Sequence, residues 1–221
     1  MVTGARGSGM GVSARGGCAG LGSTRRLRTS RIGLAGLIGF CLWTGMVRSG
    51  WSDLLSNPLD RVIRSVHSSS LGRIDHALSL LGTPVVSLAL VVLLCGLIAR
   101  RDQRQSATII VAFGAGLLVE AALKRWLFYP VTGSYPSGHA LRALFLALIA
   151  ARFLQRRSLA FGLIAIAIAV GLSRISVGDH FSDEVLGGWL LGWSLALVSW
   201  GAPRRATATA SAGGRSVATR H

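Results

Sequence analysis

Acidic residues, lysine and cysteine are all scarce in this chain of 221 residues. It has 8 Asp and Glu residues against 24 Lys and Arg residues, and Lys124 is the only lysine. Charged residues make up 14% of the chain and hydrophobic residues 51%, which is typical of membrane proteins rather than soluble domains. Of the three cysteines, Cys41 and Cys95 lie in apolar segments and Cys18 does not, so the sequence indicates no disulfide framework.

Long apolar runs make up most of the chain. A helix needs roughly 20 apolar residues to cross the hydrocarbon core of a bilayer, and six segments reach or approach that length. One run, "LAFGLIAIAIAVGL", has no polar face, as a lipid-embedded helix should. The sequence therefore predicts an all-α, polytopic membrane protein, a bundle of six transmembrane helices over about 32–47, 77–99, 106–126, 138–153, 158–175 and 185–202.

The formal charge of +16 would suit a nucleic-acid-binding protein, but its distribution argues against one. Arginines cluster before the first predicted span, between the second and third, between the fourth and fifth, and after the sixth. These segments share one side of a six-span chain, and the positive-inside rule makes that side cytoplasmic. We therefore expect a multi-pass protein of the cell membrane with cytoplasmic termini, in which residues 1–31 and 203–221 are flexible tails of a single domain, 32–202.

The loops expected on the other side are about 48–76, 127–137 and 176–184. The last two, together with the span ends beside them, carry almost every side chain with catalytic potential. Cations, histidines and carboxylates at four span ends indicate an outward-facing site that binds an anion and acts on it. One turn before the lone lysine, Glu120 is predicted to pair with it. The candidates are Lys124 and Arg125, then Ser137, Gly138 and His139, then Arg174, and finally Asp179, His180, Asp183 and Glu184.

The stretch "SYPSGHALR", residues 134–142, has the ordinary composition of a helix start, with proline, a small hydroxyl residue and glycine. A helix start also presents free N–H groups and the positive end of the helix dipole, and both favour phosphate. The single lysine in a chain that otherwise uses arginine indicates that position 124 needs a compact ammonium group.

Together these residues resemble the type 2 phosphatidic acid phosphatase superfamily, which also includes vanadium haloperoxidases and bacterial acid phosphatases. The second motif of that family, Pro-Ser-Gly-His, is complete at residues 136–139. Its third motif, Ser-Arg, five residues and His, is matched by Ser173, Arg174 and His180. With the predicted spans, the resemblance covers about residues 77–200.

The first motif of the family departs from its pattern here. Counted from Lys124, the arginine-proline pair of the family falls on Val131 and Thr132, so the lysine is kept and the arginine is lost. We predict that Arg142, about one turn into the fourth span, turns toward bound phosphate as the substitute. The weaker candidate is Arg125.

The third motif departs at its last position, where the family has an aspartate. Three residues after His180, the chain has Glu184, and Asp183 is one residue short of that register. We favour Glu184 as the carboxylate that orients the imidazole, with Asp183 as the alternative.

The resemblance implies a phosphohistidine mechanism without metal or other cofactor. His180 would attack phosphorus, and His139 would protonate the leaving oxygen and later assist water. The nonbridging oxygens would be bound by Lys124, Ser137, Gly138, Arg174 and Arg142.

The implied activity is that of an integral membrane phosphatase acting on a lipid phosphate or polyprenyl diphosphate. Phosphatidate, phosphatidylglycerophosphate and undecaprenyl diphosphate all fit, and the loops do not choose between them. The expected partners are the bilayer and its lipid substrate, not nucleic acid, and the oligomeric state is undetermined. A lipid-phosphate phosphotransferase, a non-catalytic transporter, scramblase or binder of lipid headgroups, and a degenerate structural subunit stay open as alternatives.

Overall fold

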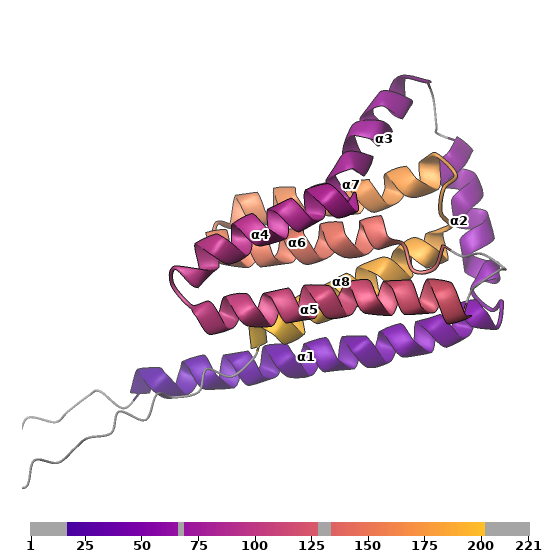
Figure 1. Cartoon of the computed structure of the whole chain (residues 1–221). Helices are drawn as coiled ribbons and strands as arrows, with labels where there is room; N and C mark the ends of the chain where they lie inside the picture. Colours follow the sequence, from indigo (N-terminus) through magenta and orange to yellow (C-terminus); the bar gives the residue numbers. More distant parts are fainter. Residues whose placement is uncertain (1–16, 66–68, 128–133, 202–221) are drawn as a thin grey trace, which may run out of the picture.

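The structure, a computed structural model, describes residues 17–65, 69–127 and 134–201 (Figure 1). These residues form helices joined by short connections and contain no strand, which confirms the predicted all-α class. The predicted tail 203–221 and the positions Val131 and Thr132 lie outside the described residues. Of the predicted tail 1–31, residues 17–31 are described and form the first part of the first helix, so this part is helical rather than a flexible tail. In chain order the helices are α1 (Gly17–Arg48), α2 (Asp53–Ser65), α3 (Ser69–Leu81), α4 (Pro84–Ala99), α5 (Gln103–Ala122), a π-helical turn (Leu123–Leu127), α6 (Gly138–Leu154), α7 (Arg157–Ser176) and α8 (Ser182–Gly201).

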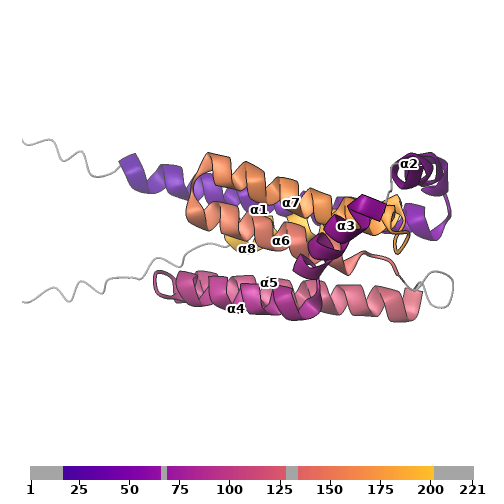
Figure 2. The ribbon, with the colours of Figure 1, turned by 90° about the horizontal axis from the view of Figure 1, so that it is seen from above.

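Six of these helices run side by side, and two gather at one end. In Figure 1, α1 and α4 to α8 share a common direction, whereas α2 and α3 lie at the end away from the chain termini. Figure 2 shows α4 and α5 as a second layer against the remaining helices. At the centre, α6 packs against α7 and α8, and α1 packs along α8. We call the end that carries α2 the α2 end.

By length and composition, three helical segments can cross a membrane: Arg28–Arg48, Gln103–Trp126 and Arg157–Ser176. A fourth crossing would combine Gly72–Leu81 with Pro84–Ala99, which are bent by 47° relative to each other. The continuous span predicted for 77–99 is therefore broken, because Gly82 and Thr83 form a turn and Pro84 starts a new helix. The predicted number of six spans stays a prediction, since α6 and α8 do not pass the same criterion in the described chain.

The segment 48–76, expected as a loop, is largely helical. It contains all of α2 and the first part of α3. The sequence prediction missed α2 because its 13 residues are too few to cross a bilayer.

An apolar core fills the half of the bundle away from α2. It brings together Val91, Ile109, Phe113, Phe145 and Ile149 from α4, α5 and α6. The rings of Phe113 and Phe145 are 5.6 Å apart. The buried side chains with catalytic potential lie instead toward the α2 end, so this packed half anchors the helix ends that carry them.

Two glycines of α8 allow α6 to approach closely. A Cβ atom at Gly188 would come within 2.4 Å of the Ser137 carbonyl oxygen, and one at Gly192 within 2.5 Å of the Leu141 carbonyl oxygen. Small residues one turn apart are a common device for bringing membrane helices together. The approach also lets Ser137 donate its backbone N–H to the Glu184 carbonyl at 2.9 Å, which joins the starts of α6 and α8.

This packing predicts that Gly192→Ala destabilises the protein by about 1–3 kcal/mol, because backbone atoms must move to admit the methyl group. Gly114 is the matched control, since a Cβ there meets nothing within 4 Å. Gly114→Ala should leave stability unchanged or raise it by up to about 1 kcal/mol, as expected for glycine in a helix. Thermal unfolding of the two detergent-purified variants measures the difference, and equal melting temperatures would contradict the packing argument.

Candidate active site

His180 lies in the short connection between α7 and α8 and is held by Glu184. Its Nδ1 is 2.8 Å from Glu184 Oε2. The same carboxylate accepts the backbone N–H of Phe181 at 3.1 Å and the hydroxyl of Ser134. When Nδ1–H donates to a carboxylate, the other ring nitrogen, Nε2, is left unprotonated and able to act as a nucleophile or base.

Asp183 has a different set of partners. Its Oδ2 accepts the Ser52 hydroxyl at 2.8 Å, and its Oδ1 accepts the backbone N–H of Glu184 at 2.8 Å. Its carbonyl oxygen accepts Trp43 Nε1–H of α1 at 3.0 Å. Asp183 therefore ties α1 and the turn before α2 to the start of α8, and of the two candidate carboxylates it is Glu184 that contacts His180.

The electrostatics of the two carboxyl groups differ accordingly. Both precede the predicted span that begins at Val185. Burial raises the pKa of Asp183 above its usual range. Burial alone would also raise the pKa of Glu184, but hydrogen bonds from His180 and Ser134 outweigh it and hold this pKa below the usual range. Glu184 is therefore ionised at neutral pH, as the partner of an imidazole N–H should be.

The Pro-Ser-Gly-His stretch begins α6 directly beside this connection. Ser137 is the N-cap residue, and its hydroxyl oxygen is buried without a hydrogen-bond partner in the described chain. A Cβ at Gly138 would lie 2.0 Å from Glu120 Oε1, so a side chain at this position would displace the Glu120 carboxylate. His139 packs against Gly82 of the broken span, where a Cβ would be 2.8 Å from the imidazole Cδ2.

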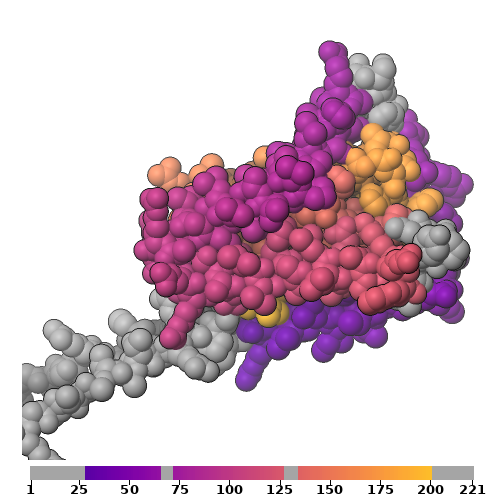
Figure 3. Space-filling model, viewed as in Figure 1, coloured from indigo at the N-terminus to yellow at the C-terminus, as the bar shows by residue number. Residues whose placement is uncertain are grey.

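The second and third motifs, far apart in the sequence, meet around His139. This histidine lies within electrostatic range of the side chains of Arg174, Arg142, His180 and Lys124. The structure thus brings together predicted site residues from the π-helical turn after α5, from α6, from α7 and from the α7–α8 connection at the α2 end. Figure 3 shows this connection, in orange, at the surface between α3 and α2.

Glu120 binds two of the predicted phosphate-binding cations at once. Its Oε1 is 2.8 Å from Lys124 Nζ, the pairing predicted from the sequence, and its Oε2 is 2.8 Å from Arg142 Nη1. Arg142 also donates from Nε to the Gly82 carbonyl oxygen at 2.9 Å and is only 5% exposed. The guanidinium is therefore already held from two sides, by α5 and by the α3–α4 turn. The weaker candidate, Arg125, is exposed.

Arg174, at the end of α7, binds the Ser79 hydroxyl and the Asp179 carboxylate. Its Nε–H is buried and has no hydrogen-bond partner among the described residues. The Asp179 side chain is half exposed, so this ion pair sits at the mouth of the site rather than in its interior. An incoming anion can replace Asp179 as the partner of Arg174.

Residues of α2 that the sequence prediction missed hold the His180 connection in place. Asp60 Oδ1 accepts the backbone N–H of Ser182 at 2.9 Å, which caps α8. Arg64 donates to the carbonyl oxygens of Ile175 and His180, at 3.3 Å each, and lies over the Phe181 ring.

The pattern of α2 runs opposite to that of a helix in a soluble protein. Ser56 and Asp60, one turn apart, are buried against the bundle. The apolar side chains point outward, and they are Trp51 just before the helix, then Leu54, Leu55, Leu59 and Val62. This outward apolar stripe, which is typical of a helix that faces lipid, is the sequence signal by which α2 could have been predicted.

In the described part of the chain, no three His, Cys, Asp or Glu side chains gather as a metal site requires. The arrangement offers an oriented histidine, a second histidine and a set of cations around buried N–H and O–H donors. Such donors bind a tetrahedral anion such as phosphate.

Comparisons with known proteins agree with this geometry. The family model described as the PAP2 superfamily matches residues 124–208, starting at the lone lysine. Phosphatidylglycerophosphatase B of Bacillus subtilis is 28% identical over 142 residues, which covers 55% of this chain and 70% of that protein.

Two solved structures share the fold. The transmembrane PAP2 type phosphatidylglycerolphosphate phosphatase from Bacillus subtilis superposes with a TM-score of 0.64 at 21% identity, covering 76% of this chain and 94% of that one. For LpxE of Aquifex aeolicus the TM-score is 0.55 at 22% identity, with 66% and 94% covered. In its motifs, helices and relatives this chain is similar to the PAP2 superfamily, and it is a phosphatase embedded in the membrane by several helices.

Proposed function

We propose that the protein hydrolyses a membrane lipid phosphate through a phosphohistidine on His180, without a metal ion. The observation that carries this proposal is the bond from His180 Nδ1 to Glu184, which leaves Nε2 as the nucleophile. His139 lies within electrostatic range of His180 and so is near the same substrate.

In the first step, His180 Nε2 attacks phosphorus and forms a P–N bond while the bond to the lipid oxygen breaks. The phosphate anion bound beside His139 favours the protonated form of this histidine, which gives its proton to the departing oxygen, so the lipid alcohol leaves uncharged. In the second step, neutral His139 takes a proton from water, whose oxygen attacks phosphorus and breaks the P–N bond. Inorganic phosphate leaves and both histidines return to their starting states.

Phosphate binding uses donors that have no partner within the described protein. The Ser137 hydroxyl and Arg174 Nε–H are both buried and unpaired, which is costly unless a ligand satisfies them. The backbone N–H of Gly138, in the first turn of α6, adds a donor at a helix N-terminus. Lys124 and Arg142 add positive charge around His139.

Arg142 remains our candidate for the missing first-motif arginine. Its Nε and Nη1 are used by Gly82 and Glu120, so Nη2 is the group that would meet the phosphate. In this arrangement, the hydrogen bonds to Glu120 and to the Gly82 carbonyl oxygen fix the orientation of the guanidinium.

The substrate is an amphiphile whose headgroup enters at the α2 end. The outward apolar stripe of α2 lies next to the His180 connection, so a lipid beside α2 has its headgroup at the level of the site. The curated relative and one structural neighbour, both from Bacillus subtilis, carry the name of a phosphatidylglycerophosphate phosphatase, which favours phosphatidylglycerophosphate over phosphatidate and undecaprenyl diphosphate. The arginine clusters at the other end support cytoplasmic termini and an outward-facing site.

The activity itself is tested by phosphate release from these three lipids in detergent, with a chelator present. His180→Ala should lower turnover at least about 10³-fold, because the nucleophile is removed. His76→Ala, a change at an exposed histidine of α3, should retain activity. Release that stops on chelation, or that survives in His180→Ala, would contradict the mechanism, and lipid binding without release would favour a headgroup binder.

The choice of orienting carboxylate is tested by two isosteric changes. Glu184→Gln should reduce kcat by about 10³- to 10⁴-fold, as in other sites where an imidazole loses its orienting carboxylate. Asp183→Asn keeps the volume and one acceptor for Ser52, so it should lower the melting temperature and change kcat far less. The reverse order of the two kcat values would make Asp183 the orienting group.

The role of Arg142 is tested by Arg142→Gln, with Arg125→Gln as the control that removes the same charge nearby. Loss of a charged hydrogen bond to phosphate should raise KM about 10- to 100-fold. Arg125→Gln should leave KM within about twofold, the range of an exposed charge. If a folded Arg142→Gln protein has the KM and kcat of the parent, Arg142 is a structural link between Glu120 and Gly82 and does not bind substrate.

A further inference from the structure

Two adjoining cavities open at the end of the bundle opposite the active site. The first, of about 380 Å³, is an apolar groove between α1, α6 and α8, lined by Leu148, Ile149, Ala196 and Leu197. The second, of about 200 Å³, is polar and is lined by residues that include Arg101, Asp102 and Gln105. Arg152 and Trp200 line both cavities, so the two adjoin across these side chains, and we treat them as the apolar half and the polar half of one candidate site.

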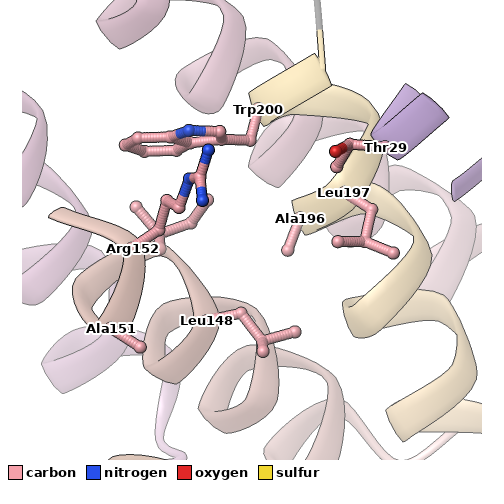
Figure 4. A pocket seen from close by; sticks show the side chains of 8 residues that line it. Thr29, Leu148, Ala151, Arg152, Ala196, Leu197 and Trp200 are labelled. Carbon is pink, nitrogen blue, oxygen red and sulfur yellow. The ribbon is translucent and has the colours of Figure 1, made fainter. Parts of the chain in front are cut away.

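Arg152 and Trp200 make a cation–π contact where the two cavities adjoin, with the guanidinium carbon 5.8 Å from the centre of the ring. Figure 4 shows this pair on one side of the groove, with Leu197 on the other side and Leu148 below. In the polar half, the Arg101 guanidinium carbon lies 5.3 Å from the centre of the Phe153 ring. A guanidinium that lies over an aromatic ring can still donate N–H groups to an anion.

The surroundings of the polar half are strongly positive. Among the described residues at this end, Asp102 is the only one with a carboxylate. This carboxylate caps α5 by accepting the Gln105 backbone N–H at 3.1 Å. The Gln105 side chain donates to the Ser199 carbonyl oxygen at 2.9 Å, which fixes this wall of the cavity. Further arginines of the same end are Arg28, Arg31, Arg100, Arg104, Arg156 and Arg157.

We propose that this site binds an anionic phospholipid of the leaflet opposite the active site, with its phosphate against Arg101 and Arg152 and one acyl chain in the apolar groove. A positive pocket joined to an apolar groove at a helix end fits an amphiphile better than a free anion, and basic pockets between membrane helices commonly bind lipid headgroups. The binding does not depend on the proposed catalytic function, because the site shares no residue with the active site.

The experiment is native mass spectrometry of the full-length, delipidated protein in detergent. Dioleoyl phosphatidylserine is the probe, since it is neither a phosphomonoester nor the product of the proposed reaction. Dioleoyl phosphatidylcholine and glycerophosphoserine are the comparison ligands. Both phospholipids carry the phosphate, but only the serine headgroup has a carboxylate that can accept a further charged hydrogen bond from the arginines. We therefore expect phosphatidylserine to bind about tenfold more tightly than phosphatidylcholine, and glycerophosphoserine, which has no acyl chains, not to bind measurably.

Two double variants distinguish binding at this site from attraction to the overall positive charge of this end. The double variant Arg101→Gln/Arg152→Gln should lose the preference for phosphatidylserine. The matched control Arg100→Gln/Arg157→Gln removes the same charge at the same end without touching either cavity and should keep it. An active-site change, Arg174→Gln, should also keep it.

Leu148→Trp fills the groove and leaves both arginines in place, so it tests the acyl half even if the double arginine variant does not fold. It should weaken phosphatidylserine binding in a protein that retains its melting transition. Any of four results would overturn the proposal: equal affinity for phosphatidylcholine, equal losses in the two double variants, loss in Arg174→Gln, or unaltered binding in Leu148→Trp.

Discussion

The arrangement of the α2 end depends on the hydrogen bond between His180 and Glu184. Glu184 is 2% exposed, and a buried carboxylate is tolerated only when donors surround it. Its donors come from three directions: the imidazole it orients, the backbone at Phe181, and Ser134 in the segment before α6. Because α8 must begin where these donors converge, α6 and α8 have to approach closely, and the α8 glycines permit this. α2 supplies the remaining anchor through Asp60, which caps α8.

The charged side chains inside this apolar bundle are stabilised by ion pairs rather than by contact with water. Glu120 lies between Lys124 and Arg142, so the buried Arg142 and the partly exposed Lys124 share one counter-charge. Arg174 is paired instead with the half-exposed Asp179. In the proposed mechanism, an entering phosphate group would displace this exposed carboxylate, whereas the buried carboxylate of Glu120 would stay and keep Lys124 and Arg142 in position.

Much of this arrangement could be predicted from the sequence, because apolar runs mark helices and the Pro-Ser-Gly-His stretch marks the start of α6. The choice between Asp183 and Glu184 followed from register, and the structure places Glu184 on His180. The contribution of α2 could not be predicted, because its apolar stripe faces outward and its polar residues bury against segments more than 100 positions away. The bend at Gly82 was missed for a related reason: one glycine in an apolar run looks like part of a span until Arg142 and His139 are seen to pack against it.

The central claim, a covalent phosphohistidine on His180, is tested most directly by trapping it. The protein would be mixed with lipid carrying radiolabelled phosphate and denatured in alkali during turnover, since phosphohistidine survives alkali and is lost in acid. The account predicts label on the protein that is stable in alkali, released in acid and absent from His180→Ala. Turnover that continues while the protein stays unlabelled at every quench time would contradict it and would require direct attack by water.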